Sequence, residues 1–377
     1  VANEGDNYAR IACCEAGVNR LVAMMEEFGT DDLYALGDYI IEISRKGAIE
    51  AISEVPTGVY KNMLKMDGYE NELELHATLT VTKNSMHVDF TGTSGLSKKG
   101  INVPLNYATA YTVFALRCLV GPDIPNNAGS LAPFTVEGPK NCILNAQHPA
   151  PVAMRHTLGQ VTPDLVLGCL HQALPDRVPA EGASCMFDLP MRHAPEVAAN
   201  GGREFAIEPV HNGGTGARPH ADGLSATAYP SGVFGSQVEI TESVAQVVMW
   251  RRELLPDSAG PGKFRGGLGQ RIEMTSSNDA PFIVFLSVER LKFPALGRMG
   301  GHPGAPGRIR FREGDMDIPG KGELRVAPGD YLIFDTPGGG GFGAPSERAS
   351  EALALDLKRG LVSEVGAAAY GPAAGKD

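Results

Sequence analysis

The sequence predicts an α+β fold, with a mixed helix and sheet region first and a mainly β, Gly- and Pro-rich region second. In the first half, apolar residues recur at helical spacing in some segments and alternate in others. From about Ser184, short apolar runs are separated by Gly and Pro. A final segment, "SERASEALALDLKRGLVS", is typical of a helix, with Ser346 as its N-cap. The predicted regions are therefore 1–183, 184–345 and 346–377.

The first region is expected to open with two helices and a strand pair. Ile11, Val18 and Leu21 lie near helical spacing, Gly29 ends that helix, and a second helix begins near Asp31. After "VPTGVY", the alternating segments "LELHATLTV" and "MHVDFTG" predict two paired strands.

Two further helices and two short strands complete the first region. "NVPLNYATAYTVFALRCLVG" is typical of a buried helix, and "TPDLVLGCLHQALP" predicts another, with Thr162 as its cap and Pro163 in its first turn. The short strands are expected at "FTVEG" and "CILNA".

The second region is expected to consist of short strands. The segments that predict them are "QVEITESVAQVVMWRREL", "QRIEMTSS", "FIVFLSVE", "RIRFRE" and "YLIFDTPGGGGFG". Glu239 and Glu242 in the first of these are either carboxylates facing a site or solvated residues of an alternating strand.

Composition and charge limit the function classes. A formal charge of −11 over 377 residues argues against a nucleic-acid surface, which needs excess Lys and Arg. No apolar run approaches the roughly 20 residues that cross a bilayer, and no signal peptide is evident, so we expect a cytoplasmic protein that does not enter membranes. The cysteines lack zinc-site spacing and are expected to be free thiols: Cys13, Cys14, Cys118, Cys142, Cys169 and Cys185.

Two Gly-rich segments have a composition that is also found in the phosphate-binding loops of nucleotide sites. "TPGGGGFG" offers consecutive unhindered N–H groups for a phosphate, but no Gly-Lys-Ser/Thr follows, so a tight turn or close backbone contact with another chain is the alternative. "GPGKFRGGLGQ" lacks P-loop spacing.

The segment "VHNGGTGARPHADG", residues 210–223, concentrates His211, His220 and Asp222 among glycines. A metal needs at least three well-placed ligands, and no HExxH or HxH pattern is present anywhere in the chain. No GxSxG motif indicates a serine nucleophile. From the residues alone, a hydrogen-bonded structural role is the alternative for each histidine.

A series of segments, in order along the chain, carries a resemblance to a known family. They are "DFTGTS", "GINVPLNYA", "DIPNNAGSLAPFTV", "HPAPVAMR", "GGTGARPHADG", "PDSAGPGKFRGGLG", "RLKFPALGRMGGHPGAPG" and "DTPGGGGFGAPSER". Together they resemble the hydantoinase B/oxoprolinase family over residues 5–370.

The resemblance implies a role in ATP-dependent chemistry with a partner. Members are similar to the second component of enzymes that open cyclic amides, or that carboxylate ketones such as acetone and acetophenone. The implied partner is a hydantoinase A-type ATPase subunit, which uses ATP to phosphorylate the carbonyl or enol oxygen of a small-molecule substrate. Three hypotheses follow: a cyclic amide hydrolase component, which we favour, a ketone carboxylase component, and a non-catalytic half that holds partner subunits together.

The sequence departs from the family pattern at its start. The family's divalent-metal site lies in a His- and Asp-rich segment upstream of the helix that begins here at residues 5–9. We therefore expect no complete metal site within these residues, and we place the divalent metal on a missing N-terminal segment or on a separate N-terminal metal-binding chain.

The family motifs also indicate site residues. His211 or Asp222 is expected to lie near the reacting carbonyl or phosphate as a catalytic residue. For His211 we expect an acid–base or hydrogen-bonding role with a pKa tuned near neutrality. The N–H groups of Gly213 and Gly214 are expected to stabilise developing negative charge. Asp89, Thr91 and Asn102 form a further polar set, for which local turn chemistry is the alternative.

Overall fold

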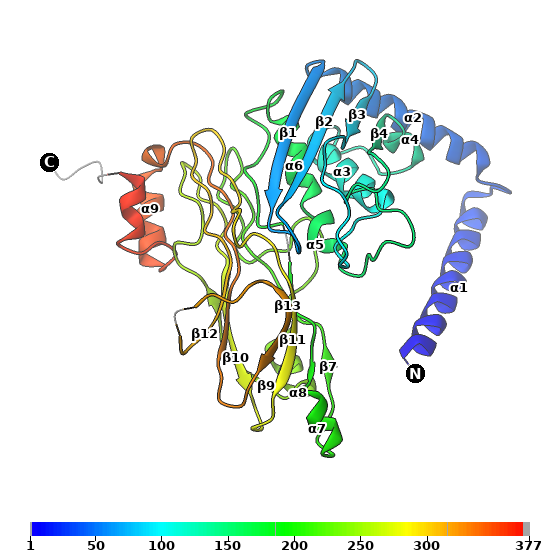
Figure 1. Ribbon diagram of the computed structural model, residues 1–377. Coiled ribbons are helices and arrows are strands. Elements are labelled where there is room, and N and C mark those ends of the chain that lie inside the picture. The colour runs from blue at the N-terminus through cyan, green and yellow to red at the C-terminus, as the bar shows by residue number, and fades with distance from the viewer. Residues whose placement is uncertain (1, 185, 315, 372–377) are drawn as a thin grey trace.

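The computed structural model describes residues 2–184, 186–314 and 316–371, and it confirms an α+β fold (Figure 1). The described residues form two large apolar cores, one built from residues between Ile52 and Val178 and the other between Phe187 and Phe334, and a small third cluster of Ala194, Val197 and Ile283. The boundaries 1–183, 184–345 and 346–377 stay a prediction. None of the described helices is long and apolar enough to cross a membrane.

The first half forms a four-stranded sheet covered by helices. Its strands lie in the order β1-β2-β3-β4, antiparallel except for the β3–β4 pair. Helices α3 and α6 pack together, and α6 also packs on β1 and β2. The elements are α1 (Ala2–Phe28), α2 (Tyr34–Ser53), β1 (Gly58–Met66), β2 (Leu73–Val81), β3 (Met86–Asp89), α3 (Leu105–Leu119), α4 (Ala128–Leu131), β4 (Phe134–Glu137), α5 (His156–Gly159) and α6 (Thr162–Leu170).

The helix and strand predictions for this half are mostly confirmed. The alternating segments form β2 and β3, and Gly29 ends α1 with φ 61°, a conformation that glycine adopts without strain. Strand β1 was not predicted, because lysine and asparagine interrupt its apolar pattern. Two details were wrong. Thr162 does not cap α6, since its hydroxyl donates to the Gly159 carbonyl, and "CILNA" makes turns instead of a strand.

The second half contains small sheets. Their strand orders are β12-β14-β10-β9, β13-β11-β6-β7 and β5-β8. The elements are β5 (Phe187–Asp188), β6 (Met191–His193), α7 (Pro195–Ala199), β7 (Ala206–Ile207), β8 (Val210–His211), α8 (Val238–Val244), β9 (Val247–Leu254), β10 (Gln270–Ser276), β11 (Phe282–Ser287), β12 (Arg308–Phe311), β13 (Lys321–Val326), β14 (Leu332–Asp335), the 3₁₀ turn η1 (Pro345–Glu347), α9 (Ser350–Lys358) and the 3₁₀ turn η2 (Gly366–Tyr370).

Two predictions at the ends of these elements were wrong. The segment that begins at Gln237 is helix α8 before it becomes strand β9, so Glu239 and Glu242 lie on a helix, where Glu242 accepts a hydrogen bond from the Met249 N–H at 2.8 Å. Ser346 lies inside the turn η1 and caps nothing, because α9 begins four residues later, after Ala349.

A glycine-rich bundle lies between the two cores. Residues 338–343 run through its middle, and their N–H groups donate to carbonyls of other segments, such as Gly339 to Gly267 at 2.9 Å and Gly340 to Glu181 at 2.8 Å. A Cβ at Gly339 would lie 1.9 Å from the Thr215 carbonyl oxygen, so no other residue fits. The segment makes close backbone contacts within this chain, and contact with another chain stays a prediction. Its N–H groups are therefore not available to a phosphate.

The two halves are joined by reciprocal hydrogen bonds. The buried Glu289 carboxylate accepts from the Asp67 N–H at 2.7 Å, and the Asp67 carboxylate accepts from the N–H groups of Leu291 and Lys292 at 2.8 and 3.0 Å. Lys321 donates to Glu289 at 2.5 Å. The loop after β11 is thereby fixed to the loop after β1.

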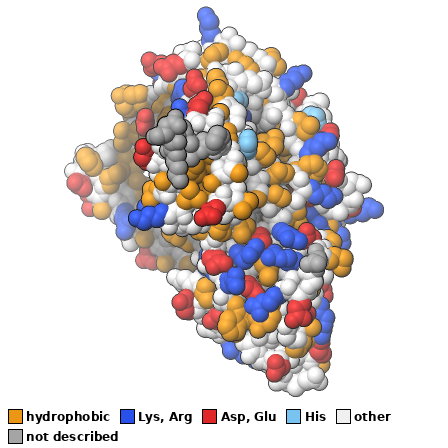
Figure 2. All heavy atoms as spheres, turned by 90° about the vertical axis from the view of Figure 1, so that its left-hand side faces the viewer, with side chains coloured by type: hydrophobic (Ala, Val, Ile, Leu, Met, Phe, Trp, Pro, Cys, Tyr) orange, Lys and Arg blue, Asp and Glu red, His pale blue; other side chains and the backbone are white. Residues whose placement is uncertain are grey.

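Basic side chains gather on one side of the second half, with acidic side chains among them (Figure 2). The sheet β12-β14-β10-β9 contributes arginines that are already paired: Arg271 and Arg310 bind Asp335 at 2.7 and 3.0 Å, and Arg251 binds Glu273 at 3.2 Å. Such pairing leaves little free positive charge for an anionic polymer.

Candidate functional site

The loop that carries the "GGTGARPHADG" motif is one wall of a pocket of about 290 Å³. Helix α3 contributes Cys118, helix α6 contributes Asp164, and the loop contributes Thr215, Gly216 and His220. The loop keeps its path because Thr215 donates its N–H to Leu224 at 2.9 Å and Ala217 donates to Gly340 at 2.9 Å. The pocket therefore lies where the first core meets the glycine-rich bundle.

The pocket walls are mostly apolar, with a few polar groups. Leu119, Leu167 and Leu224 supply apolar surface, while Asp164 and Tyr229 bring a carboxylate and a phenol. Burial, and then the charge of Asp164, raises the pKa of Tyr229, so its hydroxyl stays protonated and can donate a hydrogen bond. This combination is typical of sites for small organic ligands.

A buried charge cluster lies beneath this pocket. Arg290 contacts Asp164 at 3.4 Å and Glu181 at 3.2 Å, and all three side chains are at most 5% exposed. Ser184 Oγ donates to Asp164 Oδ2 at 2.5 Å, and the Leu296 N–H donates to Glu181 at 3.1 Å. The cluster joins α6 of the first half to the segment that follows β11.

The cluster is electrostatically and conformationally strained. Burial raises the pKa of Asp164 to about 6, although Arg290 opposes the shift. Arg290 itself has φ 66°, a left-handed conformation that costs an L-residue free energy and recurs at functional sites. A carboxyl with a raised pKa beside a ligand-sized pocket is suited to proton transfer.

His211 lies apart from this pocket. It occupies β8, opposite Phe187 of β5, and is 1% exposed. Burial, helped by the charge of Arg252, lowers the pKa of His211 to about 3, so the ring is neutral at physiological pH. The near-neutral pKa assumed from the sequence is therefore wrong for this chain, because the desolvation of the imidazole was not visible in the motif. A hydrogen-bonding role stays a prediction.

Asp222, Gly213 and Gly214 lie on the motif loop, but they contact other segments of the protein. None of them is among the described residues that line the pocket. Asp222 accepts from Arg348 at 2.8 and 2.9 Å and from the Arg265 N–H at 2.8 Å. Burial opposes ionisation, but the hydrogen bonds and charge of Arg348 outweigh it and keep the pKa of Asp222 below its usual value. Gly214 donates its N–H to Pro337 at 3.0 Å. Both glycines line a crevice of only about 10 Å³, near the size of one water.

Asp89, Thr91 and Asn102 serve local structure. Asp89 accepts from the N–H and the hydroxyl of Thr91 at 2.9 and 2.8 Å, which forms a turn after β3. Asn102 is fully buried and bonds the backbone of Ser97, Lys99 and Pro151. None of the three is among the described residues that line the pocket. Their catalytic role stays a prediction.

No sequence pattern indicated the residues of the charge cluster as site residues. Asp164 stands in a helix whose other residues are mainly apolar, and that contrast was the available signal. Arg290 lies in a family motif but has no spacing that relates it to Asp164, since the two are brought together only by folding.

The described residues do not fit a divalent metal. They contain no group of three or more His, Cys, Asp or Glu side chains placed to hold an ion. The most buried imidazole, His211, lies beside the cationic Arg252, which would repel one. The expectation that the metal is bound elsewhere stays a prediction.

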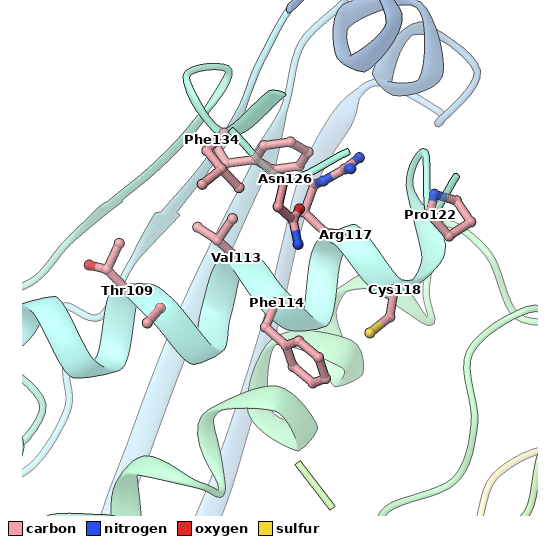
Figure 3. Close-up of a pocket in the computed structure, with 10 residues that line it drawn as sticks. Thr109, Val113, Phe114, Arg117, Cys118, Pro122, Asn126 and Phe134 are labelled. Carbon is pink, nitrogen blue, oxygen red and sulfur yellow. The ribbon is translucent and has the colours of Figure 1, made fainter. Parts of the chain in front are cut away.

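A larger hollow of about 630 Å³ follows α3 (Figure 3). It is lined by Val113, Phe114 and Phe134 and shares Cys118 with the first pocket. The cation among its described lining residues, Arg117, donates to the carbonyls of Val120 and Gly121 at 2.9 and 2.5 Å. The hollow therefore offers apolar surface without a group suited to acid–base chemistry.

Known proteins are similar to this chain over nearly its whole length. The model of the hydantoinase B/oxoprolinase family matches residues 1–345. The B component of a putative D-/L-hydantoinase of Pseudomonas sp. (strain NS671) is 28% identical over 96% of this chain and 63% of its own length. The beta chain of the caprolactamase of Pseudomonas jessenii is 29% identical over 97% of this chain and 65% of its own length. The chain thus spans under two thirds of these relatives.

Two solved structures are similar to this chain in fold. The ATP-dependent caprolactamase of Pseudomonas jessenii has a TM-score of 0.84 at 25% identity, over 99% of this chain and 67% of that chain. Acetone carboxylase has a TM-score of 0.73 at 18% identity, over 86% of this chain and 50% of that chain, which shows a shared fold. The family motifs, the fold and these matches agree: this chain belongs to the hydantoinase B/oxoprolinase family.

Proposed function

We propose that the chain is the B-type component of an ATP-dependent cyclic amide hydrolase, acting on a substrate that a hydantoinase A-type ATPase phosphorylates. Its similarity to components of a hydantoinase and a caprolactamase, and to a 5-oxoprolinase, supports this. A divalent metal held outside the described residues belongs to the same proposal.

One observation carries the proposal: the family's glycine-rich motif forms the wall of a pocket that also contains Asp164 and Tyr229. A volume of about 290 Å³ suits a small ring. In this proposal Tyr229 donates a hydrogen bond to the substrate oxygen, and Asp164 exchanges a proton with the opening amide.

The test is co-expression with a hydantoinase A-type ATPase and measurement of ATP-dependent ring opening. Hydantoin, 5-oxoproline and caprolactam are offered separately, and ADP and the opened product are quantified. We expect product in step with ADP for at least one of them. Failure with all three, in a complex that hydrolyses ATP, would overturn the amidohydrolase proposal.

A variant pair tests the pocket. Tyr229→Phe removes one hydroxyl and should lower kcat by at least about tenfold, the scale of one transition-state hydrogen bond. Tyr34→Phe, at a side chain that is 83% exposed, is the matched control and should leave kcat unchanged. Equal activity of both variants would remove Tyr229 from the mechanism.

The same complex separates the other two hypotheses. A ketone carboxylase would consume acetone or acetophenone only when bicarbonate is present. A structural half would lose assembly, and not turnover within the assembled complex, when the loop 213–223 is altered.

A further inference from the structure

The motif loop makes a tight turn, residues 218–222, at the wall of the pocket. The Arg218 N–H donates to the Ala221 carbonyl at 2.9 Å, and the Arg218 guanidinium donates to the Asp222 carbonyl at 2.8 Å. These bonds close the turn on itself. Three of its residues line the pocket of about 290 Å³: Arg218, Pro219 and His220. The contacts that hold the turn in place therefore also set the shape of this wall.

The carboxylate of Asp222 is the anchor of this turn. It accepts two hydrogen bonds from the Arg348 guanidinium, at 2.9 and 2.8 Å, and one from the Arg265 N–H at 2.8 Å. Within the described part of the chain, the hydrogen bonds that join residues 218–222 to other segments all end on this carboxylate. Two parallel charge-assisted bonds fix the orientation of the partners as well as their distance.

Arg348 belongs to a buried charge network beside the C-terminal helix α9 (Figure 1). Its side chain is 3% exposed and also donates to Asp356 of α9 at 2.6 Å. Arg265 contacts the same Asp356 carboxylate at 3.2 Å, and the Arg348 guanidinium lies 5.8 Å from the centre of the Tyr370 ring. The network thus connects α9 and η2 to the pocket wall.

We propose that Arg348 and Asp222 are positioning residues for the proposed reaction. Through Asp222, Arg348 holds the turn 218–222 at the pocket and so determines how the cyclic substrate is oriented there. This role presupposes the proposed function. It also gives α9 a part in substrate binding, although no residue of α9 is among the described residues that line the pocket. A displacement of about 1 Å in a positioning group can lower turnover roughly a hundredfold.

Hydrogen–deuterium exchange of the full chain tests the anchor without any substrate. In Arg348→Gln, the N–H groups of Arg218 and Ala221 should exchange at least about tenfold faster than in the wild type, while those of β2 keep their rates. Arg359→Gln, at an exposed arginine that follows α9, is the matched control and should leave both regions unchanged. Equal exchange of the turn in Arg348→Gln and the wild type would overturn the anchor.

A milder variant covers the case in which Arg348→Gln destabilises the whole fold. Faster exchange in β2 as well would indicate such a global effect. Asp222→Asn keeps the side-chain volume and removes only the charge, so it should release the turn while β2 keeps its rate. A turn that keeps its protection in Asp222→Asn would overturn the proposal.

The Michaelis constant of the active complex separates positioning from a loss of folded protein. Fewer folded molecules lower the apparent kcat and leave KM unchanged, whereas a displaced wall weakens substrate binding. Arg348→Gln should therefore raise KM at least about fivefold. Arg348→Lys keeps the charge but not the two parallel bonds, so its KM should be intermediate. An unchanged KM in Arg348→Gln would overturn the positioning role.

A double-variant cycle tests the route through Asp222. If Arg348 acts through this carboxylate, adding Arg348→Gln to Asp222→Asn should change KM by less than about twofold. Effects that multiply would show that Arg348 acts by another route, and would overturn the proposal. A wild-type complex that opens none of the three cyclic amides would overturn the proposed function instead, while hydrogen exchange still decides whether Arg348 anchors the turn.

Discussion

Arg290 connects the two halves of the protein through buried ion pairs. It contacts two buried carboxylates from different segments and adopts a left-handed backbone conformation. A buried cation between two anions stabilises little relative to apolar packing, but its removal leaves charges that cannot reach water.

We predict that Arg290→Gln lowers the free energy of unfolding by about 3 kcal/mol at pH 7. This decrease in unfolding free energy should be smaller at pH 5. Burial already raises the pKa of Asp164, and removal of the Arg290 charge raises it further. At pH 5 a proton therefore neutralises the unpaired carboxylate. Urea unfolding at both pH values measures this. Arg45→Gln, at an exposed ion pair on α2, is the control and should leave stability nearly unchanged, because water screens an exposed pair. A loss that is equal at the two pH values would contradict the explanation.

The burial of His211 predicts that the folded protein loses stability at acid pH. Its pKa is about 3 when folded and 6.5 as the ordinary value, so the unfolded chain binds the proton first. This contribution to stability is complete above about pH 6.5 and is lost progressively as the pH falls toward 3. Between pH 7 and pH 5 it amounts to about 2 kcal/mol. His211→Gln should remove that part of the pH dependence, as measured by urea unfolding. An unchanged slope would mean that the ring is not desolvated.

At the scale of elements, the glycine-rich bundle shows why the motifs contain so many glycines. Consecutive segments lie backbone against backbone, and a side chain at most of these positions would enter a neighbouring carbonyl. Glycine here provides space more than conformational freedom, since Gly338, Gly339 and Gly340 do not have positive φ values.

Two substitutions of glycine by alanine should therefore have opposite signs. A Cβ at Gly214 would lie 1.8 Å from the Gly267 carbonyl oxygen, so Gly214→Ala should cost at least about 3 kcal/mol, comparable to severe overpacking. Gly37 lies within α2 and has no atom within 4 Å of such a Cβ, so Gly37→Ala should stabilise by roughly 0.5–1 kcal/mol. Thermal unfolding compares the two with the wild type. Similar effects at both positions would contradict the close approach in the bundle.

For the whole molecule, the reciprocal contacts of Asp67 and Glu289 connect two separate apolar cores. Glu289→Ala leaves the N–H groups of Asp67 and Gly68 and the Lys321 ammonium without this acceptor. We expect a loss of about 3 kcal/mol and a broadened or split calorimetric transition, because the halves lose part of their coupling. Glu323→Ala, on the exposed side of β13, is the control and should keep one transition. A single sharp transition in Glu289→Ala would show that other contacts couple the halves.

Much of the fold was predictable because it depends on local patterns. Alternation predicted β2, helical spacing predicted α1, composition between Pro104 and Gly121 predicted α3, and Gly29 marked a helix end. Prediction failed where tertiary contacts decide. Gln237–Val244 has an alternating pattern that also suits the short helix α8, and Ser346 has the chemistry of a cap but lies in a turn before the helix.

The sequence by itself determined many of the helices and strands, the family and the loop that forms one wall of the pocket. It did so because periodicity, turn residues and motif order are properties of neighbouring positions. Only the tertiary structure decided which polar side chains meet. Asp164 and Arg290 lie 3.4 Å apart although they are distant in the chain, while His211, prominent in the motif, is buried elsewhere. Desolvation and charge pairing depend on what surrounds a group in space, and for these residues the surroundings come from segments far away along the chain.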